Sequence, residues 1–433
     1  MLDIKFIREN SKKVKQAVAD KGIDLSIDEL LKIDAERKTL QQKINELRED
    51  RNKLAQAAQG GRPSDEQIAK GKNLKEEIAK LEAEDREVEA KFKNLMLLTP
   101  QIPARGTPVG PDESGNVETR KWGDIPKFDF KQKDHLSLGK DLDIIDTERG
   151  VKVSGFRGYF LKNEGALLQN ALMQFAIAKM AKAGFNMITP PIIVKEFALF
   201  GTGYFPFGKG DNYEIANLNE EESGEIMKDK LYLAGTSEVG IGAYHANEIL
   251  EESELPKLYF GFSPCYRREI GGYGKDTRGI YRVHEFIKVE QFVLCKNDYK
   301  ESESWHKKMI KISESILKQL NIPHRVIQIC TGDMGAGKYK MFDIESWMPS
   351  RNNYGETHSA SNLGDWQARR LNIKYKKNNG EKEYVHTLNN TAIASPRVLI
   401  SLLECNQNSD GSINIPKVLH KYLPSGLKKI EKK

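Results

Sequence analysis

The segment PCYRREIGGYGKDTRGIYRVHEFIKVEQF, residues 264–292, joins two runs typical of β-strands through a basic, glycine-rich loop, GGYGKDTRG (271–279). Arg267 and Glu269 alternate with Arg268, so we expect both to project from one face of a strand. Arginine is suited to bidentate contact with phosphate or carboxylate. The loop is suited to a nucleotide tail or an RNA end that is admitted and released. Taken alone, the segment fits a salt-bridged surface hairpin equally well.

The composition indicates a protein that folds in water. A chain of 433 residues predicts two or three domains, and 39% hydrophobic residues are enough for sizeable cores. No apolar run is long enough to span a membrane, and the start MLDIKFIREN lacks the apolar stretch of a secretory signal. The four cysteines form no CxxC pair, which argues against zinc and predicts a reducing, cytoplasmic location. The net charge of +6 is too modest to identify a partner.

The first hundred residues predict an antiparallel pair of long helices. Two heptad-like stripes carry this prediction: Ile33, Arg37, Leu40, Ile44, Leu47, Arg51 and Leu54, and then Leu74, Ile78, Leu81, Asp85, Val88, Phe92 and Leu95. QGGRPSD (59–65) breaks the helix between them, and Ser64 or Asp65 can cap the second one. The predicted hairpin is roughly 50 Å long and brings Arg37 within reach of Asp85.

Charge does not assign a role to this hairpin. Residues 27–98 hold 15 Lys/Arg and 16 Asp/Glu, so they show no excess of positive charge for nucleic acid. An oligomerisation coil explains the heptads equally well.

The remainder predicts an α+β domain. TPQIPARGTPVGPDESGN (99–116) is interpreted as a linker, and the tail GLKKIEKK (426–433) as a disordered end. Strand-like runs such as KLYFGFSP (257–264) and YVHTLNNT (384–391) mix with helical stretches such as ALLQNALMQFAIAKMAKAG (166–184). We therefore predict a coiled-coil arm over residues 1–105, followed by a domain over 106–433 built on an antiparallel sheet with flanking helices.

Three further segments place polar residues beside strands. LAGTSEVGI (233–241) puts Glu238 at a strand terminus, YGETHSASNLGDWQARR (354–370) offers Glu356, and HTLNNTAIASPRVLISLLE (386–404) carries Arg397 at the start of a helix. Each alone fits a cap or turn, but the combination does not. GDMGAGKY (332–339) lacks the spacing and the Ser/Thr of a phosphate-binding P-loop and is interpreted as a turn.

Together these segments resemble the bacterial-type seryl-tRNA synthetases, a family of class II aminoacyl-tRNA synthetases, over essentially the whole chain. KAGFNMITPPIIV (182–194), with Pro190, resembles class II motif 1. CYRREIGGYGKDTRGIYRVHEF (265–286) resembles motif 2, and ASPRVLISLLE (394–404) resembles motif 3. The N-terminal hairpin resembles the family's tRNA-binding arm.

The resemblance implies an ATP site. Arg267 matches the arginine that holds the α-phosphate and the amino-acid carboxylate, and Glu269 contacts the adenine side. Phe286 stacks on adenine, Arg397 covers the base and reaches the γ-phosphate, and Glu356 is implied as the Mg²⁺ ligand. The full implied set is Arg267, Arg268, Glu269, Val283, Phe286, Glu356, Thr357, His358, Ser359 and Arg397.

The resemblance also implies a serine site. Glu238 pairs with the α-ammonium, and Glu290 and Thr391 read the hydroxyl, which allows alanine to be rejected. The implied set is Thr236, Ser237, Glu238, Arg267, Glu290, Asn389 and Thr391. Thr391, Asn390 and Pro396 replace a Ser, a Gly and a Gly found in many relatives.

The implied activity is ATP-dependent formation of seryl-adenylate, followed by transfer of serine to the 3′ end of its tRNA. The resemblance further implies a homodimer through motif 1, and tRNA binding by residues 27–98 and the motif 2 loop, with no membrane involved. Alternatives are a paralogue that loads a carrier protein, a non-catalytic RNA-binding protein and a coiled-coil scaffold. The intact arm argues against the first of these, and the presence of Arg267, Glu269, Glu356 and Arg397 argues against the second.

Overall fold

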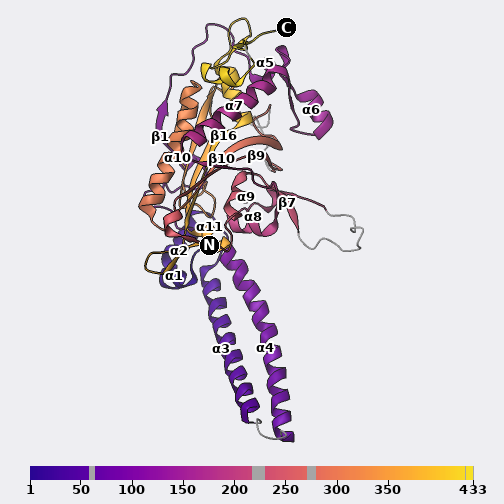
Figure 1. The fold of residues 1–433 in the computed structure, drawn as a ribbon, viewed down its shortest axis with the longest axis vertical. Helices are drawn as coiled ribbons and strands as arrows, with labels where there is room; N and C mark the ends of the chain where they lie inside the picture. Colours follow the sequence, from indigo (N-terminus) through magenta and orange to yellow (C-terminus); the bar gives the residue numbers. More distant parts are fainter. Residues whose placement is uncertain (58–63, 217–229, 271–278, 425, 433) are drawn as a thin grey trace. The chain divides into compact units, whose positions relative to one another are not determined.

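The computed structural model describes residues 1–57, 64–216, 230–270, 279–424 and 426–432. The chain separates into two compact units, Met1–Pro100 and Gln101–Lys433 (Figure 1). In the part of the chain so described, no helix combines the length and the apolar character needed to cross a bilayer.

The first unit contains the predicted helical hairpin. Its helices are α1 (Ile4–Glu9), α2 (Ser11–Asp20), α3 (Ile27–Ala57) and α4 (Asp65–Leu98). α3 and α4 pack against each other along the heptad stripes, where Leu40, Ile44, Ile78, Val88 and Phe92 are buried. Ser64 caps α4 as predicted, in a capping box with Gln67. The predicted break at Gly60, Gly61 and Pro63 lies outside the described residues.

The sequence placed Arg37 within reach of Asp85, and in the structure the ion-pair partner of Arg37 on α4 is Glu89. Arg37 bonds Glu89 at 3.2 Å, one helical turn beyond Asp85 along α4, and stacks on the Phe92 ring at 4.3 Å. Arg37 also contacts Asp34, which is buried and accepts two hydrogen bonds from Arg8 at 2.7 and 2.8 Å. The Arg8 pair ties α1 to α3, and no heptad pattern could have predicted it.

The second unit is built on an eight-stranded sheet in the order β1-β11-β12-β13-β16-β10-β9-β4. All neighbours are antiparallel except β4 and β9, which are parallel. The strands are β1 (Val117–Trp122), β4 (Asn186–Ile188), β9 (Lys257–Tyr266), β10 (Glu285–Cys295), β11 (His324–Gln328), β12 (Lys340–Met348), β13 (Asn353–Gly364) and β16 (His386–Ala394).

Helices cover the central strands on both faces. On one face the main core joins the sheet to α7 (Asn163–Lys182), α10 (Tyr299–Gln319) and α12 (Ser395–Cys405) (Figure 1). On the other face Phe292 and Leu294 of β10 pack with α9 (Ser237–Ala243) and α11 (Trp366–Leu371). This explains why the last four residues of β10, 292–295, are apolar at successive positions. The predicted α+β class is confirmed.

Smaller elements complete the second unit. The helices are α5 (His135–Asp141), α6 (Thr147–Ser154) and α8 (Glu196–Thr202). The short strands are β2 (Ile145–Asp146), β3 (Phe160–Leu161), β5 (Ile193–Lys195), β6 (Tyr213–Glu214), β7 (Leu231–Leu233), β8 (Ile249–Glu251), β14 (Lys374–Lys376), β15 (Lys382–Tyr384), β17 (Ile413–Asn414) and β18 (Lys429–Ile430).

Two segments are more ordered than the sequence predicted. The segment interpreted as a linker is anchored, because Gln101 and Ala104 donate their amides to the carbonyls of Ala336 and Tyr339 at 2.9 and 2.7 Å. The tail predicted to be disordered forms β18, which pairs with β17 and buries Ile430. Two apolar residues, Leu427 and Ile430, among lysines are too weak a pattern to predict that strand.

Candidate active site

A cavity of about 200 Å³ opens on the α9 side of the central strands and collects most of the predicted site residues. The lining comes from the segment that follows β9, from β10, β13 and β16, and from the starts of α9 and α12. It comprises Tyr204, Glu238, Arg267, Glu269, Tyr281, Val283, Phe286, Lys288, Glu290, Lys338, Glu356, Thr357, Ser359, Ser361, Asn389, Thr391, Ala394, Pro396 and Arg397.

Arg267 and Glu269 lie just after β9, and the predicted strand alternation is wrong for them. β9 ends at Tyr266, and Glu269 has a φ of 51°, in the left-handed region. Both residues still reach the cavity. Arg267 donates to the Gly235 carbonyl at 3.3 Å and lies 5.4 Å from the centre of the Phe286 ring. Glu269 forms an ion pair with Arg282 at 3.2 Å.

A second cationic group lies at the start of α12. Arg397 donates to Glu356 Oε2 at 3.0 Å and stands over the Tyr281 ring at 4.5 Å. Pro396 occupies the first turn of the helix, where its missing N–H costs no hydrogen bond. The predicted helix start at Arg397 is therefore compatible with the proline.

Asp343 lies near Glu356, and the sequence analysis did not identify it as a site residue. Asp343 on β12 pairs in register with Ser359 on β13, and its Oδ1 is buried with no hydrogen-bond partner among the described residues. Burial raises the pKa of Asp343 well above its usual value, and the nearby Glu356 carboxylate adds to that rise. A carboxylate inside the strand MFDIESWM was the available signal.

Glu238 is held by three neutral donors. The side-chain amides of Asn389 and Gln367 donate to its Oε1 at 2.7 and 2.8 Å, and the Tyr204 hydroxyl donates to its Oε2 at 2.8 Å. Burial, followed by the Glu238 charge, raises the pKa of Tyr204 well above its usual value, so this hydroxyl stays a donor. Glu238 lies in the first turn of α9, where the sequence had placed a strand terminus.

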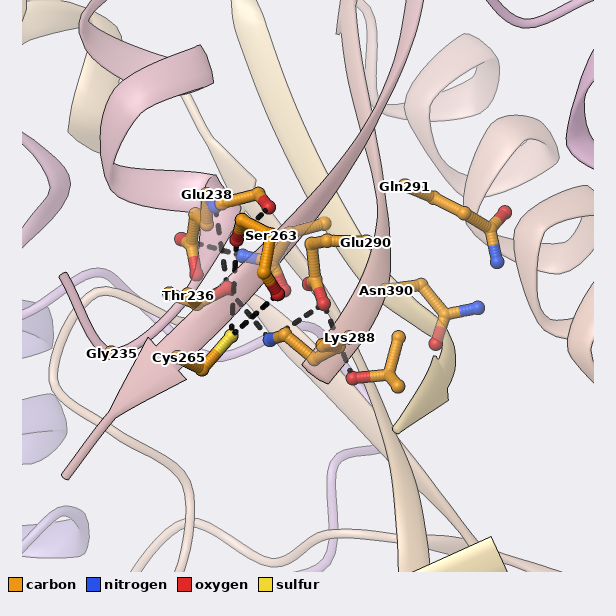
Figure 2. Close-up of polar contacts among 12 residues, drawn as sticks. Gly235, Thr236, Glu238, Ser263, Cys265, Lys288, Glu290, Gln291 and Asn390 are labelled. Atoms are coloured by element: carbon orange, nitrogen blue, oxygen red, sulfur yellow. Dashed lines mark hydrogen bonds and ion pairs between the residues drawn. The ribbon is translucent and has the colours of Figure 1, made fainter. Parts of the chain in front are cut away.

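Glu290 lies between a cation and a hydroxyl. Lys288 Nζ is 2.7 Å from Glu290 Oε2, and Thr391 Oγ1 donates to the same oxygen at 3.3 Å. Lys288 also donates to Thr236 Oγ1 at 2.6 Å (Figure 2). Burial raises the pKa of Glu290, the positive charge of Lys288 opposes that rise, and Glu238 adds to it.

Because side chains alternate along β10 and β16, neighbouring residues face either the cavity or helix α10 on the other side of the sheet. Gln291 and Asn390 point away from Glu290 in Figure 2 and donate to Ser313 of α10 at 3.0 and 2.9 Å. The Asn390 departure from the family pattern therefore does not touch the cavity.

Four residues predicted for the site do not line the cavity. Thr236 caps α9 and Ser237 bonds Ser263 at 2.7 Å. His358 is buried against the Thr357 hydroxyl, and burial lowers its pKa to about 3. Arg268 follows Arg267 in the chain without reaching the lining. Binding roles for these four, as for the predicted residues that line the cavity, remain predictions.

Sequence reasoning missed other lining residues. Tyr204, Lys288 and Lys338 line the cavity, and Gln367 supports it from α11. Lys338 belongs to GDMGAGKY, which forms the predicted turn yet contributes to the lining. Within the described ranges, no cluster of three or more His, Cys, Asp or Glu could hold a metal ion alone.

Comparison with known proteins agrees with this geometry. Residues 221–406 match the model of the tRNA synthetase class II core domain (G, H, P, S and T), and residues 1–103 match the seryl-tRNA synthetase N-terminal domain. The fold is thus that of a class II aminoacyl-tRNA synthetase.

Full-length relatives narrow the class to one family. The chain is 44% identical to the serine–tRNA ligase of Deinococcus radiodurans, over 98% of this chain and 97% of the relative. The crystal structure of seryl-tRNA synthetase from Pyrococcus horikoshii complexed with ATP is 40% identical, covers both chains fully and superposes with a TM-score of 0.88. That of the cytoplasmic enzyme from Naegleria fowleri in complex with AMP has 31% identity, a TM-score of 0.86, and coverage of 100% and 99%. The chain belongs to the seryl-tRNA synthetase family.

Proposed function

We propose that the chain activates L-serine with ATP and transfers it to the 3′ end of its cognate tRNA. The observation that carries this proposal is one cavity that joins two buried carboxylates, Glu238 and Glu290, to two arginines, Arg267 and Arg397. The test is charging of total tRNA with labelled serine. We expect serine to be accepted in an ATP-dependent way, and labelled threonine or alanine to be accepted poorly.

The serine site uses both carboxylates. Glu238 receives the α-ammonium of serine. Its three hydrogen-bond donors are neutral, so none of them offsets its negative charge. Glu290 and Thr391 receive the side-chain hydroxyl, and Arg267 receives the carboxylate. Thr236, Ser237 and Asn389 support these groups. Alanine has no hydroxyl to bond Glu290 and Thr391 in this buried site, and the loss of that hydrogen bond is the physical basis for its rejection.

The ATP site uses the other half of the cavity. Arg267 contacts the α-phosphate, Glu269 and Phe286 contact adenine, and Arg397 covers the base and reaches the γ-phosphate. The remaining residues of this site are Arg268, Val283, Glu356, Thr357, His358 and Ser359. The Arg267 guanidinium over Phe286 and the Arg397 guanidinium over Tyr281 support a site that combines aromatic surface with fixed positive charge.

Glu356 and Asp343 fit a magnesium ion that accompanies ATP. Two carboxylates on neighbouring strands, one with an unpartnered buried oxygen, are the ligands Mg²⁺ takes when phosphate oxygens complete its shell. Mg²⁺ bound there would offset phosphate charge. We propose Glu356 as the main ligand and Asp343 as its neighbour in the site.

The chemistry needs positioning more than a protein nucleophile. A serine carboxylate oxygen attacks the α-phosphorus, forming the acyl–phosphate bond as the bond to pyrophosphate breaks. Arg267 lies where negative charge increases during this step. In the second step a terminal ribose hydroxyl of the tRNA takes the seryl group and AMP leaves.

The two domains divide the work. We propose residues 1–105 as the tRNA-binding arm, acting through residues 27–98, and residues 106–433 as the catalytic domain. The motif 2 loop, proposed as a second tRNA contact, falls in 271–278, outside the described residues. The proposed location is the cytoplasm.

We propose that two copies pair through motif 1. β4 is the edge strand of the large sheet, and its Met187 is 48% exposed. Ile193, which follows β4 closely in the chain, is also exposed. Exposed apolar side chains on and after an edge strand are typical of an interface between subunits.

A further inference from the structure

Lys288 is a buried charge to which the class II motifs assign no role. Only 5% of its surface is exposed, and its Nζ contacts Glu290 Oε2 at 2.7 Å and Thr236 Oγ1 at 2.6 Å. A buried lysine is costly unless it is paired and hydrogen-bonded. Lys288 is paired with Glu290 and hydrogen-bonded to Thr236, so the surrounding residues hold its ammonium group in a fixed position in the cavity.

The two contacts join both ends of the proposed serine pocket. Lys288 and Glu290 are two residues apart on β10 and therefore face the same side of the sheet. Thr236 is the N-cap of α9, whose first turn carries Glu238. The Lys288 ammonium group therefore links Glu290, proposed to bind the serine hydroxyl, to α9, the helix that carries Glu238 (Figure 2).

The charges around Glu290 show what this link does. Glu290 is buried, and Glu238 on α9 is a second negative charge whose field acts on it. Arg267 after β9 and Lys288 on β10 are the opposing cations, and Cys265, Tyr204 and Thr391 are the remaining polar neighbours. Lys288 is the cation in direct contact. Its removal would leave Glu290 desolvated near a like charge, which favours the protonated carboxyl.

We propose that Lys288 is a positioning residue for amino-acid selection: it keeps the Glu290 carboxylate ionised and fixed in orientation as the acceptor of the substrate hydroxyl. This rests on the proposed serine site. Lys288 acts through Glu290 and Thr236, and the loss of its charge therefore affects serine far more than ATP.

The test is steady-state ATP–pyrophosphate exchange by Lys288→Met, with serine and ATP varied separately between pH 6 and 8.5. The serine KM should rise about 30-fold or more, because truncating one partner of a buried charge pair leaves the other unpaired. The ATP KM should stay within about twofold of wild type, since its proposed contacts lie on other residues. The serine defect should be largest at pH 6 and shrink towards pH 8.5, as Glu290 ionises again. A purely structural defect would show no such pH dependence.

Matched variants identify the route of the effect. Lys288→Arg keeps the charge and should recover much of the serine affinity. Lys296→Met removes an exposed lysine just after β10, which pairs with Glu252 at 2.9 Å, and should match wild type. The double variant Lys288→Met/Glu290→Gln should bind serine no worse than Glu290→Gln alone, because Lys288 then has no carboxylate to hold.

Three outcomes would overturn the inference: a pH-independent serine defect, a further loss in the double variant, or equal damage to ATP and serine. If Lys288→Met does not fold, serine binding by the double variant is compared with that by Glu290→Gln, and this comparison alone tests the inference. Neither of these two variants contains an unpaired Glu290 carboxylate. Wild-type protein without serine-dependent exchange would instead refute the proposed function, so the two failures are distinguishable.

Discussion

At the residue scale, Glu290 is the side chain that we propose distinguishes serine from alanine. Glu290→Ala removes a buried acceptor, and serine kcat/KM should fall by about 10-fold to 100-fold or more, equivalent to about 1–3 kcal/mol. The ATP KM should change much less. Pyrophosphate exchange at varied serine and varied ATP measures both. Near-wild-type serine kinetics would remove Glu290 from the pocket.

Arg267 tests the charge stabilisation at the α-phosphate. Arg267→Lys keeps the charge but loses the planar fork of donors, so kcat for adenylate formation should fall at least about tenfold, or about 1.4 kcal/mol in barrier. Single-turnover adenylate formation is the measurement. Arg268→Lys is the comparison variant and should be the more tolerant of the two, because Arg268 belongs to the proposed ATP site but does not line the cavity. Equal sensitivity of the two arginines would contradict the assigned role.

Residue-scale prediction from the sequence succeeded where chemistry follows a motif and failed where contacts are long-range. Arg267, Glu290, Glu356 and Arg397 lie in segments whose residue types and order are specific, and all four line the cavity. Tyr204 and Gln367 reach Glu238 from 34 and 129 positions away. No local pattern encodes such contacts, and the roles of all these side chains await the measurements above.

At the element scale, an ion pair holds the edge strand β1 to helix α10. Arg120 donates to Glu314 at 3.1 and 2.8 Å, and His324 lies 3.8 Å away. Burial alone would raise the pKa of Glu314, but His324 and Arg120 outweigh it and lower the pKa to about 2. A depressed carboxyl pKa stabilises the fold above the unfolded-state value, and this contribution is lost as pH falls towards 2.

Glu314→Gln should therefore lower the Tm at pH 7, and the difference from wild type should shrink between pH 5 and 3. Thermal unfolding followed by circular dichroism across that range measures it. Glu303→Gln, at an acidic residue earlier on α10 that is 3.5 Å from Lys340, is the control and should show a smaller difference. A Tm difference that does not vary with pH would contradict this account of the β1–α10 contact.

Elements with strong local signals were predictable, whereas their exact pairing was not. The heptads of α3 and α4, the capping Ser64 and the strand-to-helix change at α12 follow from periodicity and caps. Arg37 pairs with Glu89 and not with Asp85 one turn before it, because periodicity alone does not select between two acidic residues on one face of α4. Glu269 does not lie in the predicted strand, because β9 ends at Tyr266 and Glu269 adopts a left-handed conformation that the residue types do not predict.

At the scale of the whole molecule, the arm should be dispensable for adenylate formation and required for charging. Removing residues 41–86 and bridging the ends with a short turn keeps the Arg8–Asp34 and Arg37–Glu89 pairs. Serine-dependent pyrophosphate exchange should persist, since the cavity residues all lie beyond residue 200. Aminoacylation should fall by about 100-fold or more, because the tRNA is no longer positioned.

Both activities are measured on one preparation, with circular dichroism to confirm folding and sedimentation to follow oligomeric state. If the shortened protein charges tRNA normally, the arm is not the tRNA-binding element. If it also changes from dimer to monomer, the coil serves oligomerisation.

The central claim, that this cavity activates serine, is tested most directly by ATP–pyrophosphate exchange with each of the twenty amino acids on the full-length protein. We predict strong exchange with serine, weak exchange with threonine or alanine, and loss of the serine signal when Mg²⁺ is chelated. Strong exchange driven by another amino acid, with serine inert, would contradict the account.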